Sequence, residues 1–325
     1  TLHWSQREPL DSVVFEEESM PDVPEWTEYL EGLLGQTEER DLLIENLEMF
    51  LGACLCGIAT DYDKVFVLEG SGNNGKSGLI DVIRKLLFDP SQVACSGPQN
   101  WADKFGSRDL EGKLINLVSE LDDRSMMSST MLKAVVTGDL IRAEIKNGAS
   151  YSFSFRGGNL WSTNGLPEMR DQSYGFKRRF EILPLTQDFS KNGKSRQMSE
   201  IFAELVPRKF AIVQRLIWRA AQLKKQKRYH KTAHTTKRLE EWSSESSPIS
   251  AFVAQCLEVK SHFTTKQTDI YEEFEAFADK NSLSAKERPS RIKFYRELAA
   301  AGVPKVPKKG ATDHFDCIVK KRMDW

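Results

Sequence analysis

The feature that most constrains this chain is a glycine-rich segment at residues 70–77, which reads GSGNNGKS. A short apolar run at 64–68 precedes it, and residues 77–88 follow with apolar side chains at helical spacing. A strand, a glycine-rich turn and a helix in this order match the G-x-x-x-x-G-K-S pattern of a phosphate-binding loop. Glycines let the backbone N–H groups point at a phosphate, and the helix start adds the positive end of its dipole. The sequence therefore predicts that residues 70–77 bind a nucleoside triphosphate.

All eight residues of this segment are predicted to contact the nucleotide, and two have specific roles. Lys76 would reach the β- and γ-phosphates, and Ser77 would coordinate Mg²⁺. The expected cofactors are therefore ATP and Mg²⁺. The predicted contact residues are Gly70, Ser71, Gly72, Asn73, Asn74, Gly75, Lys76 and Ser77.

Carboxylates follow a second predicted strand at 113–118. Glu120 and Asp122 lie two residues apart, so they share one face of an extended chain, whereas Asp123 points the other way. One acid should hold Mg²⁺ and another should polarise the attacking water. We assign Glu120 to the metal and Asp122 to the second role, while Asp123 stays an alternative to Asp122. A solvated acidic turn is the competing interpretation.

A third predicted strand, at 159–162, leads into Asn164. The Asn164 amide can hydrogen-bond the attacking water or the γ-phosphate, although Ser-Thr-Asn is also a common way to begin a loop. Because strands alternate with helices between residues 64 and 162, the pattern predicts an α/β fold with a mainly parallel sheet. Two helices are expected before it, from residue 26 to about residue 57, with a break near 35–37.

Five motifs in this region resemble those of superfamily III helicases, and more closely those of the phage, plasmid and poxvirus primase-helicase family. Members of that family typically read G-x-G-x-N-G-K-S, S-E-x-x-(E/D), T-G-(G)-D, x-x-T-N-x-x-P and R-R-F-x-x-x-P-F. This chain carries similar motifs at 70–77, 119–123, 137–139, 162–167 and 177–185. It departs from the family with a single Gly138, where a pair is frequent, and with Leu185, where an aromatic is usual. The resemblance implies a P-loop, AAA+-like core.

The resemblance also implies roles for individual residues. Lys76, Glu120 and Asp122 would act in catalysis as described, and Asn164 would sense the γ-phosphate. Arg178 or Arg179 looks like an arginine finger that acts on the nucleotide of a neighbouring subunit. Such a role requires a ring, so the resemblance implies a homohexamer. A surface basic pair, or a clamp for DNA phosphates, is the alternative for Arg178 and Arg179.

A β-hairpin is predicted at 140–153, where Asn147-Gly148 is flanked by alternating residues. Lys146 would stand at the tip, with Arg142 on the same face of its strand. In superfamily III rings a basic hairpin of this kind tracks the DNA backbone, so the resemblance implies that Arg142 and Lys146 contact DNA. A solvent-exposed tip without a partner is the alternative.

Residues 249–325 are predicted to form a second unit of three helices followed by two strands, which looks like a winged helix. Its last forty residues are rich in lysine and arginine. Arg291, near the start of the third helix, and Lys308, in the wing, are the predicted DNA contacts. A small packing domain with a solvated basic face is the alternative.

Composition sets broader limits. Residues 1–50 carry a net charge of −12 and the other 275 residues carry +11, a basic body suited to a polyanion. Five cysteines without a C-x-x-C pair argue against a disulfide framework and a zinc site.

No run of 18 apolar residues occurs, so we expect no membrane span and a place in the host-cell cytoplasm. The chain starts at Thr1 without an initiator Met, so we expect a fragment.

Four segments are expected. They are an acidic lead-in with helices (1–57), an ATPase core (58–224), a basic linker (225–248) and a winged-helix-like domain (249–325). Together the motifs favour an ATP-dependent helicase that moves on single-stranded or forked DNA during replication of a virus, phage or mobile element. A primase or polymerase domain in the same full-length chain is the implied partner. An ATP-dependent initiator or loader without processive unwinding is the alternative, and a small-molecule P-loop kinase is a third reading, disfavoured by the basic C-terminal unit.

Overall fold

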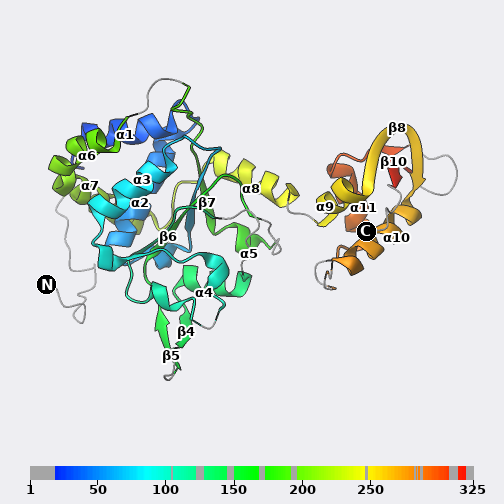
Figure 1. The fold of residues 1–325 in the computed structure, drawn as a ribbon, viewed down its shortest axis with the longest axis horizontal. Helices are drawn as coiled ribbons and strands as arrows, with labels where there is room; N and C mark the ends of the chain where they lie inside the picture. The colour runs from blue at the N-terminus through cyan, green and yellow to red at the C-terminus, as the bar shows by residue number, and fades with distance from the viewer. Residues whose placement is uncertain are drawn as a thin grey trace. The chain divides into compact units, whose positions relative to one another are not determined.

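A parallel sheet of five strands, in the order β2-β3-β6-β1-β7, lies at the centre of the first unit (Figure 1). This computed structural model describes residues 19–103, 105–121, 128–144, 150–167, 173–191, 196–245, 248–281, 283, 285, 288–306 and 314–319. The strands are β1 (Val65–Glu69), β2 (Val93–Ala94), β3 (Ile115–Val118), β6 (Gly158–Thr163) and β7 (Phe180–Pro184). Strands β3, β6 and β7 are buried throughout, as in a sheet covered on both faces. The predicted α/β class is confirmed.

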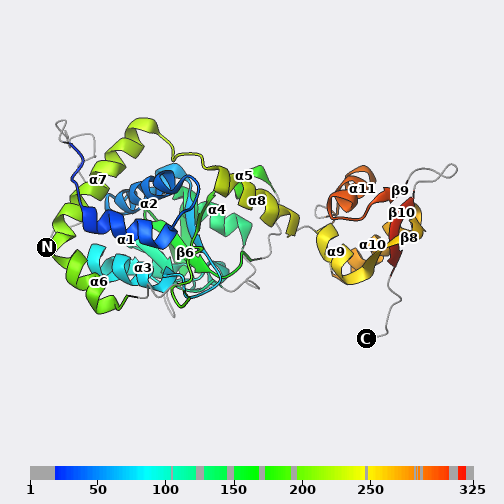
Figure 2. The same ribbon diagram turned by 90° about the horizontal axis from the view of Figure 1, so that it is seen from above.

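The chain forms two units, one of Thr1–Pro167 with Ser173–Leu239 and one of Glu168–Gln172 with Glu240–Trp325. Helices of the first unit surround the sheet, and α2 and α7 lie side by side in both views (Figures 1 and 2). In the part of the chain that the structure describes, no helix has the length and apolar character needed to cross a bilayer. The helices of this unit are α1 (Pro24–Leu34), α2 (Arg40–Leu55), α3 (Lys76–Val82), α4 (Ser129–Thr137), α5 (Tyr174–Lys177), α6 (Met198–Leu205) and α7 (Lys209–Gln226). Helix α8 (Ala233–Glu245) begins in this unit, which ends at Leu239.

The two expected N-terminal helices are present, and the break between them falls where the sequence predicted it. Gly35 follows α1 with a φ of 62°, a left-handed value that glycine adopts without strain. The predicted helix after residue 77 is also present as α3, which continues into a π-helical turn at Ile83–Leu87.

Apolar spacing predicts a single long helix over residues 200–223 despite Pro207, and that prediction is wrong. The chain instead forms α6, a 3₁₀ turn at Val206–Arg208 and then α7. Pro207 causes the interruption, because its nitrogen carries no hydrogen for a helical bond and its ring clashes with the preceding turn. Helix α8 occupies residues 233–245 of the segment 225–248, which the sequence predicts to be a basic linker.

A buried carboxylate ties the N-terminal helices to α7. Glu48 is fully buried, and its Oε1 accepts hydrogen bonds from Trp26 Nε1 at 3.0 Å and Arg215 Nε at 2.7 Å. Its Oε2 accepts from Arg219 Nε at 2.9 Å. Removing one partner of such a buried pair typically costs about 3–5 kcal/mol, because the other charge is left uncompensated. The contact therefore fixes α1, α2 and α7 as one layer beside the sheet.

The predicted hairpin is confirmed as strands β4 (Leu140–Glu144) and β5 (Ser150–Ser154), which pair antiparallel and project from the first unit (Figure 1). Ile141 and Ala143 are buried, whereas Arg142 between them is exposed, so the predicted alternation holds. The expected tip, with Lys146 and Asn147-Gly148, lies outside the described residues.

The second unit has its own apolar core, around Phe252, Phe274 and Phe294. The predicted helices and the two predicted strands are present, but the sequence missed the long strand β8 after the first helix. The elements are α9 (Pro248–Cys256), β8 (Leu257–Lys266), α10 (Gln267–Lys280), α11 (Arg291–Ala300), β9 (Lys305–Val306) and β10 (His314–Val319). The three strands form an antiparallel sheet in the order β8-β10-β9.

Candidate nucleotide-binding site

The 70–77 loop joins β1 to α3 at the carboxyl edge of the parallel sheet. In the strand register, Glu69 at the end of β1 lies opposite Thr163 of β6 and Pro184 of β7. The Gly70 N–H donates to the Thr163 carbonyl oxygen at 3.2 Å, and the Leu185 N–H donates to the Glu69 carbonyl oxygen at 2.8 Å. The loop is therefore held between the ends of two neighbouring strands, the position where open α/β sheets bind ligands.

The loop backbone has the shape that an anion-binding cradle requires. Gly72 and Gly75 have φ values of 109° and 84°, and Asn73 between them has a φ of 47°. A Cβ at Gly70 would collide with the Asn74 amide and the Leu185 carbonyl oxygen, so only glycine fits there. At Gly72 no atom lies within 4 Å of an added Cβ, which leaves open space beside the backbone. Residues with positive φ in such a turn direct successive backbone N–H groups toward a common point.

Lys76 lies inside this cradle and is 8% exposed. Its Nζ donates to the Gly70 carbonyl oxygen and to two amide oxygens, Asn74 Oδ1 and Asn164 Oδ1, each at 3.1 Å. Burial lowers the pKa of Lys76, and the negative charge of Glu120 works against that shift. The structure thus brings together three residues that the sequence assigned to one site, although Asn164 is 88 residues away from Lys76.

The Asn74 side chain is buried beneath the loop. It is 2% exposed, and its Nδ2 donates to the Leu185 carbonyl oxygen at 2.9 Å while its Oδ1 accepts from Lys76. Its side chain therefore faces the protein interior. Ser71 and Ser77 are exposed at the two ends of the loop.

Glu120 follows β3 at the same carboxyl edge, and its side chain is exposed. Strand β6 lies between β3 and β1, so two strand spacings, about 10 Å, separate the lines of the two strands. Ser77 and Glu120, the predicted metal ligands, therefore lie on segments that follow β1 and β3 at this edge. Asp122 and Asp123 lie outside the described residues.

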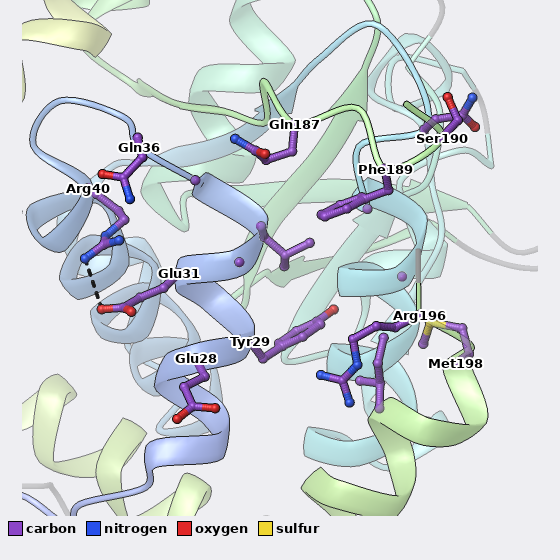
Figure 3. A pocket seen from close by; sticks show the side chains of 17 residues that line it. Glu28, Tyr29, Glu31, Gln36, Arg40, Gln187, Phe189, Ser190, Arg196 and Met198 are labelled. Carbon is purple, nitrogen blue, oxygen red and sulfur yellow. Dashed lines mark hydrogen bonds and ion pairs between the residues drawn. The ribbon is translucent and has the colours of Figure 1, made fainter. Parts of the chain in front are cut away.

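A cavity of about 690 Å³ opens beside the loop and was not anticipated from the sequence (Figure 3). Asn73, Gly75 and Gly78 form one side of it, α1 contributes Tyr29, and the segment after β7 contributes Phe189. The other lining residues are Glu28, Glu31, Gly32, Leu33, Gly35, Gln36, Arg40, Gln187, Ser190, Arg196, Met198 and Ile201.

Two features of the cavity point to an aromatic, partly polar ligand. The Tyr29 side chain projects into it, and its hydroxyl is buried without a hydrogen-bond partner among the described residues (Figure 3). Burial raises the pKa of Tyr29, so the hydroxyl keeps its proton and can donate. The Phe189 N–H donates to the Asn73 carbonyl oxygen at 2.9 Å, which fixes the Phe189 ring next to the loop. Of Tyr29 and Phe189, only Tyr29 belongs to a pattern visible in the sequence, the apolar face of a predicted helix.

The structure does not bring Arg178 and Arg179 to the loop. They precede β7, whose first residue pairs with Val65 at the start of β1, so a strand length of roughly 16 Å separates them from the carboxyl edge. Arg178 is exposed and forms an ion pair with Asp63 at 2.9 Å. Arg179 is 7% exposed, and its guanidinium donates to the Gly175 carbonyl oxygen. Of the two, only Arg178 presents its guanidinium to solvent.

The predicted DNA contacts lie on other surfaces. Arg142 is exposed on the hairpin and donates to Ser150 Oγ at 3.1 Å. Arg291 is exposed at the start of α11, with its guanidinium 4.7 Å from the centre of the Tyr271 ring. Lys146 and Lys308 lie outside the described residues.

Comparisons with known proteins agree with this fold. A family model described as a family of unknown function (DUF5906) matches residues 68–179, a stretch that includes the 70–77 loop, Glu120 and Asn164. No curated protein matches the sequence of the chain.

Among solved structures, the chain is similar to an apo structure of the NrS-1 C-terminal region, with a TM-score of 0.51 and 13% identity over 96% of this chain and 78% of that one. A second structure of that region aligns with a TM-score of 0.46 and 13% identity, covering 92% of this chain and 76% of that one. A JCV helicase structure aligns with a TM-score of 0.36 and 12% identity, covering 71% and 64%. The first likeness covers nearly the whole of this chain, and at this identity it concerns the fold alone.

Proposed function

We propose that this chain is an ATP-driven DNA helicase of the superfamily III type, with residues 70–77 as its P-loop. The observation that carries the proposal is the position of Lys76. Its ammonium is held by Gly70, Asn74 and Asn164 at the edge where β1 and β6 end. A buried lysine within a cradle of left-handed glycines has few other uses than binding phosphate oxygens.

ATP bound with Mg²⁺ supplies the phosphoanhydride bond whose hydrolysis provides energy. In our proposal the loop N–H groups and Lys76 hold the phosphates, and Ser77 and Glu120 hold the cation. Asp122 is the second acid that polarises water, and Asn164 orients that water. The cavity takes the adenine and ribose, with Phe189 against the base and the Tyr29 hydroxyl as a donor.

Arg178 acts in trans as the arginine finger. Its distance from the loop of its own chain excludes a role there, while its exposure suits a contact with a neighbouring subunit. Arg179 is buried and instead secures the start of β7. A composite site of this kind requires a closed ring, for which we propose a homohexamer.

DNA is held at two places in this proposal. The first is the β4–β5 hairpin, where the proposed contacts are Arg142 and Lys146, which follows β4 in the sequence. The second unit, with the element order α9-β8-α10-α11-β9-β10 and a β8-β10-β9 sheet, is proposed to be a winged-helix domain. Its contacts would be Arg291 on α11 and Lys308 between β9 and β10.

The function is tested by measuring ATP turnover and strand displacement of forked DNA by the purified chain. Lys76→Ala is expected to abolish both. Lys85→Ala, which removes an exposed lysine paired with Asp81 at 2.9 Å on the π-helical turn after α3, is the matched control and should leave both intact. Absence of nucleotide binding by the unmodified chain would refute the proposal.

An initiator or loader that assembles on DNA and then stops is the second candidate, favoured by the DNA-binding topology that we propose for the second unit. Steady turnover distinguishes the two functions, because a loader should hydrolyse ATP slowly and cease once assembled. We further propose that the chain works in replication of a virus, phage or mobile element, as the helicase part of a primase-helicase.

A further inference from the structure

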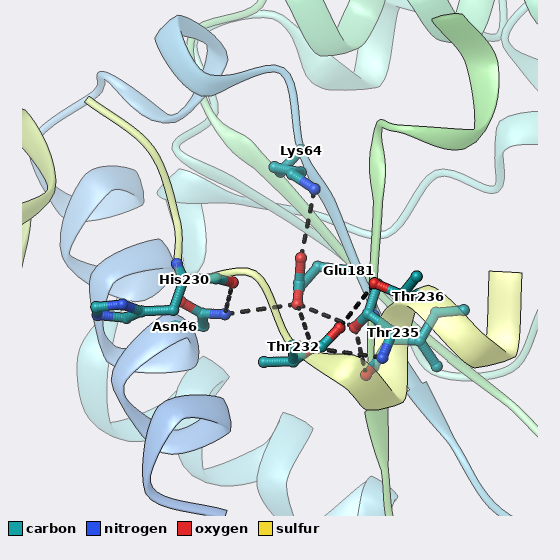
Figure 4. A network of polar contacts seen from close by, with 8 residues as sticks. Asn46, Lys64, Glu181, His230, Thr232, Thr235 and Thr236 are labelled. Atoms are coloured by element: carbon teal, nitrogen blue, oxygen red, sulfur yellow. Dashed lines mark hydrogen bonds and ion pairs between the residues drawn. The ribbon is translucent and has the colours of Figure 1, made fainter. Parts of the chain in front are cut away.

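Helix α8 is fixed to the edge of the sheet at its start. β7 is an edge strand, and the outward-facing Ile182 N–H donates to Thr235 Oγ1 at 3.2 Å. The Thr235 hydroxyl also lies 3.0 Å from Glu181 Oε1, and the Thr232 hydroxyl lies 3.4 Å from the same carboxylate oxygen (Figure 4). Side chains of α8 and of the turn before it therefore occupy the polar groups that an edge strand would leave open.

Glu181 is the centre of this attachment. It is 3% exposed, and its Oε2 lies 3.3 Å from Lys64 Nζ, just before β1 (Figure 4). Asn46 of α2 binds the backbone leading into α8, because its Oδ1 accepts from the His230 N–H at 2.8 Å and its Nδ2 donates to the His230 carbonyl oxygen at 2.9 Å. The start of α8 is thus held by α2, β1 and β7 together.

A second attachment of α8 lies at the end of β1, immediately before the 70–77 loop. Arg238 Nε and Nη2 both donate to the Glu69 carboxylate, with distances of 2.8–3.0 Å. The two side chains are each 16% exposed. Glu69 is the last residue of β1 and is followed by Gly70, whose carbonyl oxygen accepts from Lys76. A fork-shaped, charge-assisted contact fixes orientation as well as distance, so Arg238 fixes the residue from which the loop departs.

The helix that carries Arg238 also passes from one unit to the other. The first unit ends at Leu239, and the second resumes at Glu240, in the middle of α8. Trp242, four residues after Arg238 on the same helix, is 1% exposed. Residues four apart share one face of a helix. A displacement of the last turns of α8 must therefore bend the helix or move Arg238.

We propose that Arg238 is a positioning residue for the 70–77 loop and that α8 transmits the state of the second unit to the nucleotide through the Glu69–Arg238 pair. Engagement of the second unit by DNA tightens or loosens this pair and thereby changes how well the loop holds nucleotide. The inference rests on the proposed function, since it requires a nucleotide at the loop and DNA at the second unit.

The test uses the full chain and measures three quantities: the Kd for ATP, the factor by which DNA stimulates ATP turnover, and the melting temperature. The variants are Glu69→Gln, Arg238→Gln, the double variant, and the charge exchange Glu69→Arg with Arg238→Glu. Arg208→Gln, which breaks an exposed ion pair with Glu25 at 2.8 Å in the same unit, is the matched control.

Each single variant should weaken ATP binding about tenfold and reduce the DNA stimulation factor toward one, a typical size for coupling between sites. The double variant should be no worse than either single variant, because both remove the same contact. The charge exchange should restore part of the DNA stimulation. Arg208→Gln should match the unmodified chain in all three quantities.

Additive losses in the double variant, or an unchanged stimulation factor in Arg238→Gln, would overturn the inference while leaving the helicase proposal standing. A lowered melting temperature with unchanged ATP affinity would also overturn it, because Arg238 would then be structural only. If the unmodified chain binds no nucleotide, both proposals fail.

Discussion

Lys76 Nζ lies 3.1 Å from Asn164 Oδ1, so the residue that follows β6 supplies a hydrogen-bond acceptor to the lysine of the 70–77 loop. The contact joins two strands that neighbour each other in the sheet but are far apart in the sequence. It also occupies the lysine with protein oxygens, which phosphate oxygens would have to replace when a nucleotide binds.

Replacing Asn164 should therefore affect turnover more than binding. Asn164→Ala removes both the acceptor for Lys76 and the amide that we propose orients water, and misplacement at a reacting centre can cost about 100-fold in rate. We expect kcat to fall by that order while the Kd for ATP changes by less than about threefold. Asn164→Asp keeps the acceptor and removes the amide donor, so it should lower kcat while holding Lys76 in place. Pre-steady-state and equilibrium binding measurements separate the two effects.

Arg178 should be required for ATP turnover at the nucleotide of the neighbouring subunit and not at the nucleotide of its own subunit. Lys76→Ala and Arg178→Ala are each expected to be inactive alone. Mixed in equal amounts before assembly, they should regain about a quarter of wild-type turnover, because one interface in four then combines an intact Lys76 with an intact Arg178.

The control for this mixing experiment is Arg179→Ala, whose buried guanidinium should matter for folding more than for catalysis. It should lower the melting temperature, and mixing it with Lys76→Ala should restore no more turnover than the Arg179→Ala protein contributes alone. If the Lys76→Ala and Arg178→Ala mixture shows no recovery, Arg178 does not act in trans.

The elements around the loop could be predicted because they depend on local patterns. An apolar strand, a glycine-rich turn and a helix are encoded within residues 64–88, and β4–β5 follows from alternation around Asn147-Gly148. Pro207 was also visible in the sequence, yet the continuous apolar spacing around it favoured one helix over two. In the structure the missing N–H of Pro207 prevails over that spacing.

The cavity and the α8 attachments could not be predicted, since they depend on contacts between distant segments. Tyr29 and Phe189 line the same cavity only because α1 and the segment after β7 both lie beside the loop. Glu69 and Arg238 are separated by 169 positions, and neither belongs to a recognisable motif. The position of Arg178 relative to the loop likewise depends on the strand order, which no local pattern encodes.

The residues that line the cavity should contribute to the binding of ATP, through its base and ribose, and not to the binding of phosphates alone. Phe189→Ala is expected to weaken ATP binding by about tenfold, since stacking of a base on an aromatic ring contributes about 1–3 kcal/mol. Tyr29→Phe removes only the unpartnered hydroxyl and should weaken it by a few-fold, in keeping with about 1 kcal/mol for one hydrogen bond.

Inorganic triphosphate is the control ligand for this prediction. It lacks the base and ribose, so both variants should bind it as the unmodified chain does, measured by calorimetry or by competition with a fluorescent nucleotide. Equal losses for ATP and triphosphate would mean that the two residues support the loop and do not contact the base.

Glu181 should make the stability of the first unit depend on pH. Burial raises the pKa of Glu181 above its ordinary value, and Lys64 only partly opposes this. Between the ordinary and the raised pKa the folded state binds more protons than the unfolded state, so stability falls as pH rises through that window. Relative to Glu181→Gln, which cannot ionise, the unmodified chain should gain stability as pH is lowered through the raised pKa toward the ordinary value.

Asp188 provides a control of opposite sign. Hydrogen bonds from Ser190, and the nearby Lys191, lower the pKa of this partly exposed carboxyl. Its contribution is present above its ordinary pKa and is lost as pH falls through the lowered one. Urea unfolding at a series of pH values should therefore show the difference from Asp188→Asn shrinking toward acid, while the difference from Glu181→Gln shifts in favour of the unmodified chain. A Glu181→Gln difference that does not change with pH would mean that Glu181 titrates alike in the folded and unfolded states.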